Sequence, residues 1–416
     1  FRQIPDYRCG REKRHDLGEM LVCVTLGFLC GRTTIRRSLK WCKTHLEELR
    51  KHMKLKYGIA SPSTITRMLC GIDEELALYA FMEWIGEIVE SRNTHLAIDG
   101  KALCGATEKT KGETTPMLLN VVETVRGLML AQLPVDSKTN EITVIPELLK
   151  LLNISGSIVT IDAVGTQTAI MEQIHEQGGH FVLTVKKNQP EAYEEIHTFM
   201  DKLGAEDLKR KKGEAMDPGM KEFLEKYEEI SQMEKNRDRN EYRTCQICKD
   251  ASNLTKSQKE WPHVQSIGRI KQVRIPKEKD SQGNDVTPSK EEFLEKGSRR
   301  IPAPSAGEGA GKDVQCTALI SDLILTAEEL GSIKRMHWSI ENRLHHVLDD
   351  TFREDRSPAK KSRNNLSLIR KYAYNILRLA MYETGLANIM TEMMDCFCDN
   401  AALRERYVFQ GIASLY

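Results

Sequence analysis

The stretch Asn93-Thr94-His95-Leu96-Ala97-Ile98-Asp99-Gly100-Lys101 decides the fold. A short apolar run ends there in an aspartate followed by glycine and lysine. This pattern predicts a buried strand that delivers a carboxylate to the edge of a sheet, where the backbone can approach a ligand closely. We interpret Asp99 as a metal ligand. Its candidate partners are Asp162, which closes the apolar run 157–161, and Glu341, in the helical stretch 337–348.

Three carboxylates from distant parts of the chain suit phosphoryl chemistry with divalent metal ions. Hard Mg²⁺ prefers oxygen ligands and takes only a few of them from protein. Each acid also has an ordinary interpretation. An aspartate before glycine is a common turn former, and Glu341 could pair with His345 one helical turn later. A buried Asp162 must instead be paired or coordinated.

Composition and charge limit the classes of protein to which the chain can belong. With 416 residues and a hydrophobic fraction of 40%, the chain is expected to form two or three domains with proper cores. The net charge is only +1, yet residues 1–56 hold 14 Lys/Arg against 6 Asp/Glu. This basic end predicts a polyanionic partner, with a solvated helical surface as the alternative.

The eleven cysteines do not have the spacing of a disulfide framework. Cys245 and Cys248 lack a second pair at the spacing of a zinc ribbon, so reduced thiols of a cytosolic protein are the simpler interpretation. No apolar run approaches the roughly 18 residues of a membrane span.

Residues 1–92 are expected to form a helical, basic, DNA-binding domain. Helices are predicted at 17–29 and over the amphipathic stretch 33–54, then from a start at Ser61-Pro62, and finally over 74–91. This helix starts with Ser and Thr and carries Arg67. It could contact DNA phosphates, or it could be an ordinary capped helix.

From residue 93 the pattern changes to alternating strands and helices. Two β-rich runs, 118–125 and 128–135, are joined at Arg126-Gly127, which predicts a hairpin. A helix at 143–152, the strand that ends at Asp162, a helix at 166–177 and a strand at 180–185 follow. An antiparallel meander followed by parallel strands is the order of the ribonuclease H-like fold. Chemistry in such sheets gathers at the carboxyl ends of strands, where Asp99 and Asp162 are expected.

The α/β core is expected at 93–200 and 325–384, interrupted by a β-rich insertion at 201–324. Charged helical sequence up to residue 236 is expected to precede strands at 241–248 and 264–275. The segment near 276–312, rich in Lys, Glu, Gly, Ser and Pro, is expected to be a flexible loop. Beyond it the pattern predicts a strand at 316–320, helices from about 326 and at 332–348, and a helix at 364–382 packed on the sheet. Residues 385–416 form a tail to which we assign no task.

Several segments in this order resemble one family, the DDE transposases of bacterial insertion sequences, in the ISAs group that includes the H-repeat-associated proteins. The similarity runs from residue 1 to about 384. It is carried by Ala97-Ile98-Asp99-Gly100-Lys101, Thr160-Ile161-Asp162-Ala163, Val185-Lys186-Lys187-Asn188-Gln189 and His337-Trp338-Ser339-Ile340-Glu341-Asn342.

The resemblance implies that Asp99, Asp162 and Glu341 form an acidic triad that holds two Mg²⁺ ions, with Mn²⁺ as a substitute. The implied activity is metal-dependent cleavage of double-stranded DNA at the element's terminal inverted repeats, followed by strand transfer into target DNA. Paired ends imply a dimer or larger assembly, in the bacterial cytoplasm with the nucleoid. Trp338 is expected either to stack on an unpaired base or to be a core tryptophan. The full set expected to contact DNA is Lys101, Lys186, Lys187, Asn188, Gln189, Arg335, His337, Trp338, Asn342, Arg343, His345, Arg353 and Arg356.

The sequence departs from the family pattern near Glu341. Related transposases often carry an Arg four residues before the glutamate and a Lys seven after it, and here those positions are His337 and Leu348. Clamping of phosphate is then expected from Arg335, Arg343 or Arg353. Two rival interpretations stay open. One is a zinc site of His337, Glu341, His345 and Asp349 on one helical face. The other is an inactive, domesticated or decayed DNA-binding protein.

Overall fold

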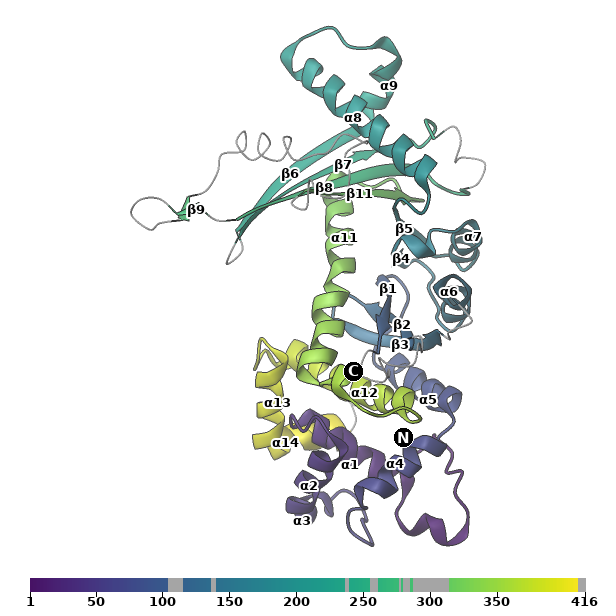
Figure 1. The fold of residues 1–416 in the computed structure, drawn as a ribbon, viewed down its shortest axis with the longest axis vertical. Coiled ribbons are helices and arrows are strands. Elements are labelled where there is room, and N and C mark those ends of the chain that lie inside the picture. Colours follow the sequence, from purple (N-terminus) through teal and green to yellow (C-terminus); the bar gives the residue numbers. More distant parts are fainter. Residues whose placement is uncertain are drawn as a thin grey trace. The chain divides into compact units, whose positions relative to one another are not determined.

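The computed structural model describes residues 1–103, 115–135, 140–235, 239–254, 261–276, 278–279, 285–286 and 314–410. The chain divides into two compact units. Unit 1 comprises Phe1–Ser157 and Met336–Tyr416, and unit 2 comprises Ile158–Arg335. The fold is mixed α/β, with N-terminal helices and an extensive sheet (Figure 1).

Unit 1 begins with a 3-10 helix, Gly10–Arg14, and a group of helices. Each of the longer helices starts at a side-chain cap: Asp16, Thr34, Ser61 and Asp73 each accept a backbone N–H of the first turn. The helices are α1 (Leu17–Leu29), α2 (Ile35–Thr44), α3 (Leu46–Leu49), α4 (Pro62–Gly71) and α5 (Glu74–Gly86).

The predicted helix at 17–29 and the predicted start at Ser61-Pro62 are confirmed. The basic stretch 33–54 is not one helix, because α2 ends at Thr44 and α3 is a separate short helix. Helix α5 ends at Gly86 rather than 91. Gly27 allows the close approach of α1 and α2, since a Cβ at this position would lie 2.1 Å from the Cβ of Ser38.

The sheet of unit 1 is the predicted antiparallel meander. It consists of β1 (His95–Ala102), β2 (Met117–Glu123) and β3 (Leu128–Val135), with β2 paired to both neighbours. The predicted hairpin at Arg126-Gly127 is confirmed, and Gly127 takes the left-handed φ of +74°. Helices α6 (Glu141–Lys150) and α12 (Arg363–Thr384) pack on β3. Contrary to expectation, Asp99 lies inside β1, which continues to Ala102.

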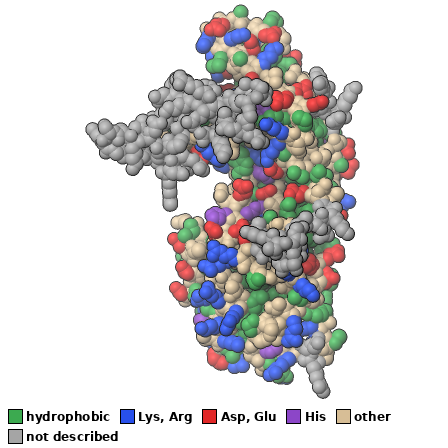
Figure 2. Space-filling view, in the orientation of Figure 1, with side chains coloured by type: hydrophobic (Ala, Val, Ile, Leu, Met, Phe, Trp, Pro, Cys, Tyr) green, Lys and Arg blue, Asp and Glu red, His purple; other side chains and the backbone are tan. Residues whose placement is uncertain are grey.

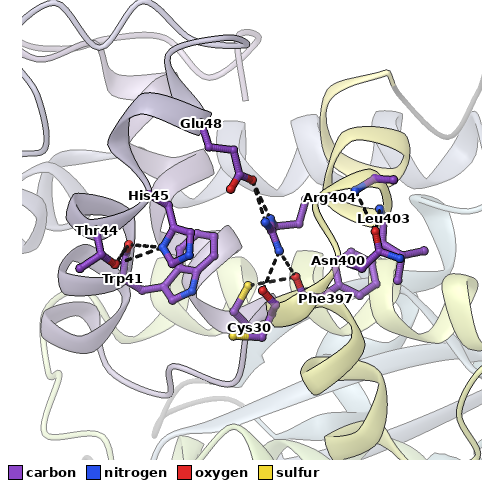
Figure 3. A network of polar contacts seen from close by, with 11 residues as sticks. Cys30, Trp41, Thr44, His45, Glu48, Phe397, Asn400, Leu403 and Arg404 are labelled. Carbon is purple, nitrogen blue, oxygen red and sulfur yellow. Dashed lines mark hydrogen bonds and ion pairs between the residues drawn. The ribbon is translucent and has the colours of Figure 1, made fainter.

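The carboxyl-terminal part of unit 1 packs against its first helices. It comprises α13 (Met390–Asp399), α14 (Ala401–Arg404) and a π-helical turn, Glu405–Phe409. The buried guanidinium of Arg404 donates to Glu48 Oε1 at 2.8 Å and to the carbonyls of Phe397 and Cys398 (Figure 3). It also lies 5.3 Å from the centroid of the Trp41 ring. This network ties α14 to α2 and α3.

The sheet of unit 2 starts with two parallel strands, β4 (Ile158–Ile161) and β5 (His180–Val185), joined through α7 (Thr168–Glu176). The parallel pairing confirms the predicted change of strand direction. Next to β5 the sheet continues antiparallel through β11, β8, β7 and β6. These strands are β11 (Val314–Ser321), β8 (Ser266–Pro276), β7 (Arg239–Cys248) and β6 (Tyr227–Lys235).

Helices flank this sheet. Helix α8 (Pro190–Lys212) packs on β7, β8 and β11, while the 3-10 turn Pro218–Met220 and α9 (Lys221–Glu225) lead into β6 (Figure 1). A separate pair of two-residue strands is formed by β9 (Glu278–Lys279) and β10 (Asp285–Val286). Apart from Pro276 and this pair, the loop expected at 276–312 lies outside the described residues.

Two expectations for this region are wrong. Residues 227–235 form the strand β6, where charged helix was expected. The two helices expected from 326 and at 332–348 are one continuous helix, α11 (Ala327–Ile340), followed by π-helical turns at Glu341–His345 and Val347–Thr351. None of the helices in the described part of the chain combines the length and the apolar character that crossing a membrane requires.

Candidate active site

Asp99 points from the middle of β1, opposite Asn120 of β2, with its side chain 25% exposed. Its Oδ1 accepts the backbone N–H of Gly100, and its Oδ2 lies 3.6 Å from Nδ1 of His345. Burial, with the positive charges of Lys101 and Lys371, lowers the pKa of His345 to about 3. His345 is therefore neutral at neutral pH, and the negative charge of Asp99 is not cancelled by the imidazole.

Glu341 is exposed at the start of the π-helical turn that follows α11. Such turns are rare and occur often at functional sites. The turn is held against the β2–β3 hairpin, because Arg343 donates to the carbonyl of Thr124 at 3.3 Å. The buried hydroxyl of Tyr374 can donate to the carbonyls of Arg343 and Gly127, each at 2.9 Å. The backbone that carries Glu341 is thus fixed to the sheet of unit 1.

Asp162 directly follows β4 and caps the 3-10 turn Ala163–Gly165. Its position at the end of a strand is the predicted one. Two lysines lie against it: Lys186 Nζ donates to Oδ2 at 2.7 Å, and Lys334 Nζ lies 3.9 Å from Oδ1. Lys334 is buried and donates to Thr184 Oγ1 at 2.9 Å. The side chain of Asp162 is 43% exposed. Sequence reasoning missed Lys334, which precedes Glu341 by seven residues.

The predicted turn of Lys186, Lys187, Asn188 and Gln189 lies beside Asp162. Asn188 Nδ2 donates to the carbonyl of Ala163 at 3.0 Å, and the Gln189 amide donates to that of Thr166. These two side chains hold the loop that follows Asp162. Both lysines are exposed, and Lys186 is the one that donates to Asp162.

Lys101 does not lie where a DNA phosphate could reach it. Its side chain is 3% exposed, and its amine donates to Asp349. Glu354 and Asp355 are also within 3.9 Å of the amine. The expectation of a phosphate contact is therefore corrected, because the Lys101 charge is already balanced inside the protein.

The other predicted DNA contacts differ in exposure. Arg335 is exposed but is paired with Glu234 at 2.8 Å on β6. His337 is buried and Trp338 is half-buried, and both lie on α11. Trp338 is therefore less exposed than a ring on which a base stacks openly. His345 is largely enclosed at its contact with Asp99. The exposed members are Asn342, Arg343, Arg353 and Arg356.

Within the described ranges, no three His, Cys, Asp or Glu side chains form a group able to hold a metal ion as they stand. The possible zinc ligands His337, Glu341, His345 and Asp349 therefore do not come together in such a group. Cys245 and Cys248 are buried free thiols. Asp99 and Glu341 belong to unit 1, and Asp162 belongs to unit 2.

Comparison with known proteins covers nearly the whole chain. Residues 90–376 match the family described as "Transposase DDE domain", and residues 1–85 match the family described as "DDE_Tnp_1-associated". The chain is 27% identical over 379 residues to "H repeat-associated putative transposase YhhI" of Escherichia coli (strain K12), covering 90% of this chain and 88% of that protein. It is 28% identical, with the same coverage, to the protein YbfL of that organism.

Among solved structures, a piggyBac transposase synaptic complex with hairpin DNA matches with a TM-score of 0.38 and 11% identity, covering 97% of this chain and 76% of that one. The DDE domain, which accounts for most of the chain, implies binding to DNA and dependence on divalent metal ions. The chain thus belongs to the family of transposases with a DDE domain, enzymes that cut and rejoin DNA strands in transposition.

Proposed function

We propose that Asp99, Asp162 and Glu341 together form the catalytic triad of a ribonuclease H-like core and bind two Mg²⁺ ions, with Mn²⁺ as a substitute. The observation that carries this proposal is the π-helical turn that starts at Glu341. It is fixed to the β2–β3 hairpin, and its last residue, His345, lies 3.6 Å from Asp99. The strand and the helix of unit 1 that carry two of the three acids are thus neighbours.

The three side chains fit divalent cations chemically. They supply carboxylate oxygens, the ligands that Mg²⁺ prefers, and none of them is fully buried. Two ammonium groups, of Lys186 and Lys334, now balance the charge of Asp162, and a metal ion would take their place on the carboxylate. When bound, the ions would activate a water and stabilise the leaving 3′-oxygen of an in-line displacement. A freed 3′-hydroxyl would then take the place of water in strand transfer.

The residues of this chain would position the DNA around that reaction. The exposed amine of Lys186 lies against Asp162, and Lys187, which is also exposed, follows it in the chain; both amines suit phosphate oxygens. The exposed guanidiniums of Arg343, Arg353 and Arg356 are further candidates within unit 1. The lowered pKa of His345 means that its imidazole does not compete as a cation for the charge of Asp99.

The N-terminal domain, 1–92, supplies a second DNA-binding surface. Helix α2 exposes four cations and no acid: Arg36, Arg37, Lys40 and Lys43. Lys and Arg side chains recur over the part of the surface that α1–α4 form (Figure 2). We propose that this helix contacts phosphates near the terminal inverted repeats, and that a dimer or larger assembly in the bacterial nucleoid brings paired ends together.

The decisive experiment is Mg²⁺-dependent nicking of a plasmid that carries the inverted repeats flanking the gene. Wild-type protein is compared with Asp99→Asn, Asp162→Asn and Glu341→Gln. The control is Asp350→Asn, which removes a 70% exposed acid shortly after Glu341. We expect nicking by wild type and control and none by the three variants. Equal nicking by all five proteins would refute the triad. DNA binding without nicking by any of them would favour the inactive DNA-binding protein.

A further inference from the structure

Two contacts in unit 1 join β1 to the helical segment that begins at Glu341. Asp99 meets His345, and Lys101 donates to Asp349. Residues two apart on a strand face the same side and lie about 6.7 Å apart. The two contacts therefore join one side of β1 to one helical segment. Glu341 lies four residues before His345 on that segment.

The Lys101 side chain is buried and surrounded by acids. The Lys101 amine is 3.7 Å from Asp355 Oδ1 and 3.9 Å from Glu354 Oε2. The Glu354 side chain is only 2% exposed, and Arg370 Nη1 lies 3.8 Å from its Oε1. Charges in such a place must be paired, because water cannot solvate them. The Lys101 charge is thus balanced inside unit 1, with none of it presented to DNA.

We propose that Lys101 is a positioning residue whose buried ion pair with Asp349 fixes the strand that carries Asp99 against the helix that carries Glu341. This inference rests on the proposed triad, since it assigns Lys101 to the geometry of two triad carboxylates. Groups that orient metal ligands typically change metal affinity or activity by about 10- to 100-fold when removed. A displacement of a reacting group by about 1 Å costs a similar factor.

The test compares Lys101→Met, Asp349→Asn and the double variant with wild type in the nicking assay, over a titration of Mg²⁺. We expect each single variant to need about 10-fold or more Mg²⁺ for half-maximal nicking, or to turn over that much more slowly. Because the two residues act as a pair, the double variant should be no worse than the worse single variant. Asp349→Glu, which keeps the charge, should recover part of the loss. Fully additive losses would overturn the proposal.

DNA affinity without metal separates positioning from phosphate binding. Lys101→Met should bind the repeats with wild-type affinity and an unchanged salt dependence, since Lys101 is enclosed. A salt slope that is shallower by about 1 would instead identify a phosphate contact and overturn the proposal. If Lys101→Met fails to fold, the Mg²⁺ titration of Asp349→Asn decides the positioning role, because Asp349 is 31% exposed and its loss breaks the same ion pair. A wild-type Mg²⁺ requirement for Asp349→Asn would then overturn the proposal.

A matched control excludes general destabilisation. Arg404→Met removes another buried, ion-paired cation of unit 1, the one that holds α14 to Glu48 (Figure 3). It should lower the melting temperature and leave the Mg²⁺ requirement of the folded fraction unchanged. An equal shift in that requirement for Arg404→Met and Lys101→Met would overturn the positioning role. If the wild type itself does not nick, the proposed function is wrong. That result is distinct from a failure of the Lys101 proposal, which requires a wild type that nicks.

Discussion

Lys186 and Asp162 form an ion pair in which both side chains remain about half exposed. Such pairs contribute about 0–1 kcal/mol to stability, because water screens them and holding two side chains costs entropy. The amine can therefore leave the carboxylate when a stronger cation arrives. The pair suits a lysine that turns to a phosphate if Asp162 binds metal as we propose.

The variant Lys186→Met tests this role. We expect its unfolding free energy to stay within about 1 kcal/mol of wild type. Its affinity for DNA should fall, with the slope of log affinity against log salt shallower by about 1. Fluorescence anisotropy at several salt concentrations measures the slope. Lys226→Met, at a half-buried lysine paired with Glu222 and Asp250, is the control and should leave the slope unchanged. Identical slopes for wild type and Lys186→Met would contradict the prediction.

Lys371 gives unit 1 a distinctive pH dependence. It is fully buried, donates to Asn120 Oδ1 at 2.8 Å and to Gln132, and burial lowers its pKa to about 8. Between pH 8 and 10.5 the unfolded chain then binds more protons than the folded chain, so this residue makes stability rise with pH across that window. Relative to Lys371→Met, the wild type should gain up to roughly 3 kcal/mol between pH 7 and 10.5, at about 1.4 kcal/mol per pKa unit. Urea unfolding at several pH values measures the difference, and a constant difference would refute it.

At the scale of single residues, the triad of Asp99, Asp162 and Glu341 stays a prediction, and two details of the sequence reasoning were wrong. Asp99 was expected at the end of a strand, because Gly100 usually marks a turn, yet β1 keeps its pairing through Ala102. Lys101 was expected to face a ligand. Its burial depends on Asp349, Glu354 and Asp355, which lie about 250 residues further along the chain, and no local pattern reports that contact.

Among the elements, α1 and α2 depend on one glycine for their close packing. An added Cβ at Gly27 would lie 2.1 Å from Ser38 Cβ and 2.5 Å from its Cα, whereas at Gly86 of α5 it would meet nothing within 4 Å. We expect Gly27→Ala to destabilise the protein by about 1–3 kcal/mol through overpacking. Gly86→Ala should stabilise it by up to about 1 kcal/mol, since alanine restricts the unfolded chain. Denaturant unfolding compares the two, and equal effects would contradict the packing argument.

The strands that the sequence predicted well are buried and apolar. Strands β4 and β5 and the β2–β3 hairpin follow the expected order. There the hydrophobic periodicity and the turn residues indicate the same structure. Strand β6 was missed because Glu228, Glu229, Glu234 and Lys235 give it the composition of an exposed helix. It lies at the end of the strand order in its sheet, where charged residues are common because they oppose unwanted pairing.

For the whole molecule, the C-terminal helices complete the core of unit 1. Met393, Met394, Phe397 and Tyr407 are all buried, and α13 contacts both α1 and α12. Each buried Met or Phe side chain contributes about 1.5–3 kcal/mol, so deleting residues 386–416 should remove roughly 5 kcal/mol or more. That loss is comparable to the total stability of a small domain.

We therefore expect the protein truncated after Gly385 to lose the cooperative thermal transition of unit 1 and to aggregate during size-exclusion chromatography. The exposed substitution Asp395→Asn on α13 is the control and should behave as wild type. A truncated protein that melts like the full chain would show that α13 and α14 are dispensable. The sequence assigned this tail no task, because its contacts with Glu48 and Cys30 are long-range.

Unit 1 takes its residues from both sides of unit 2, and this arrangement has a consequence during synthesis. The ribosome releases β1, with Asp99, long before it makes α12 and the segment that begins at Glu341. At about 5–20 residues per second, the intervening chain takes roughly 12–48 s to emerge. A nascent polypeptide therefore carries Asp99 without the helical segment that packs against it for that time. If cutting needs the proposed triad, the chain can cut DNA only after its translation is nearly finished.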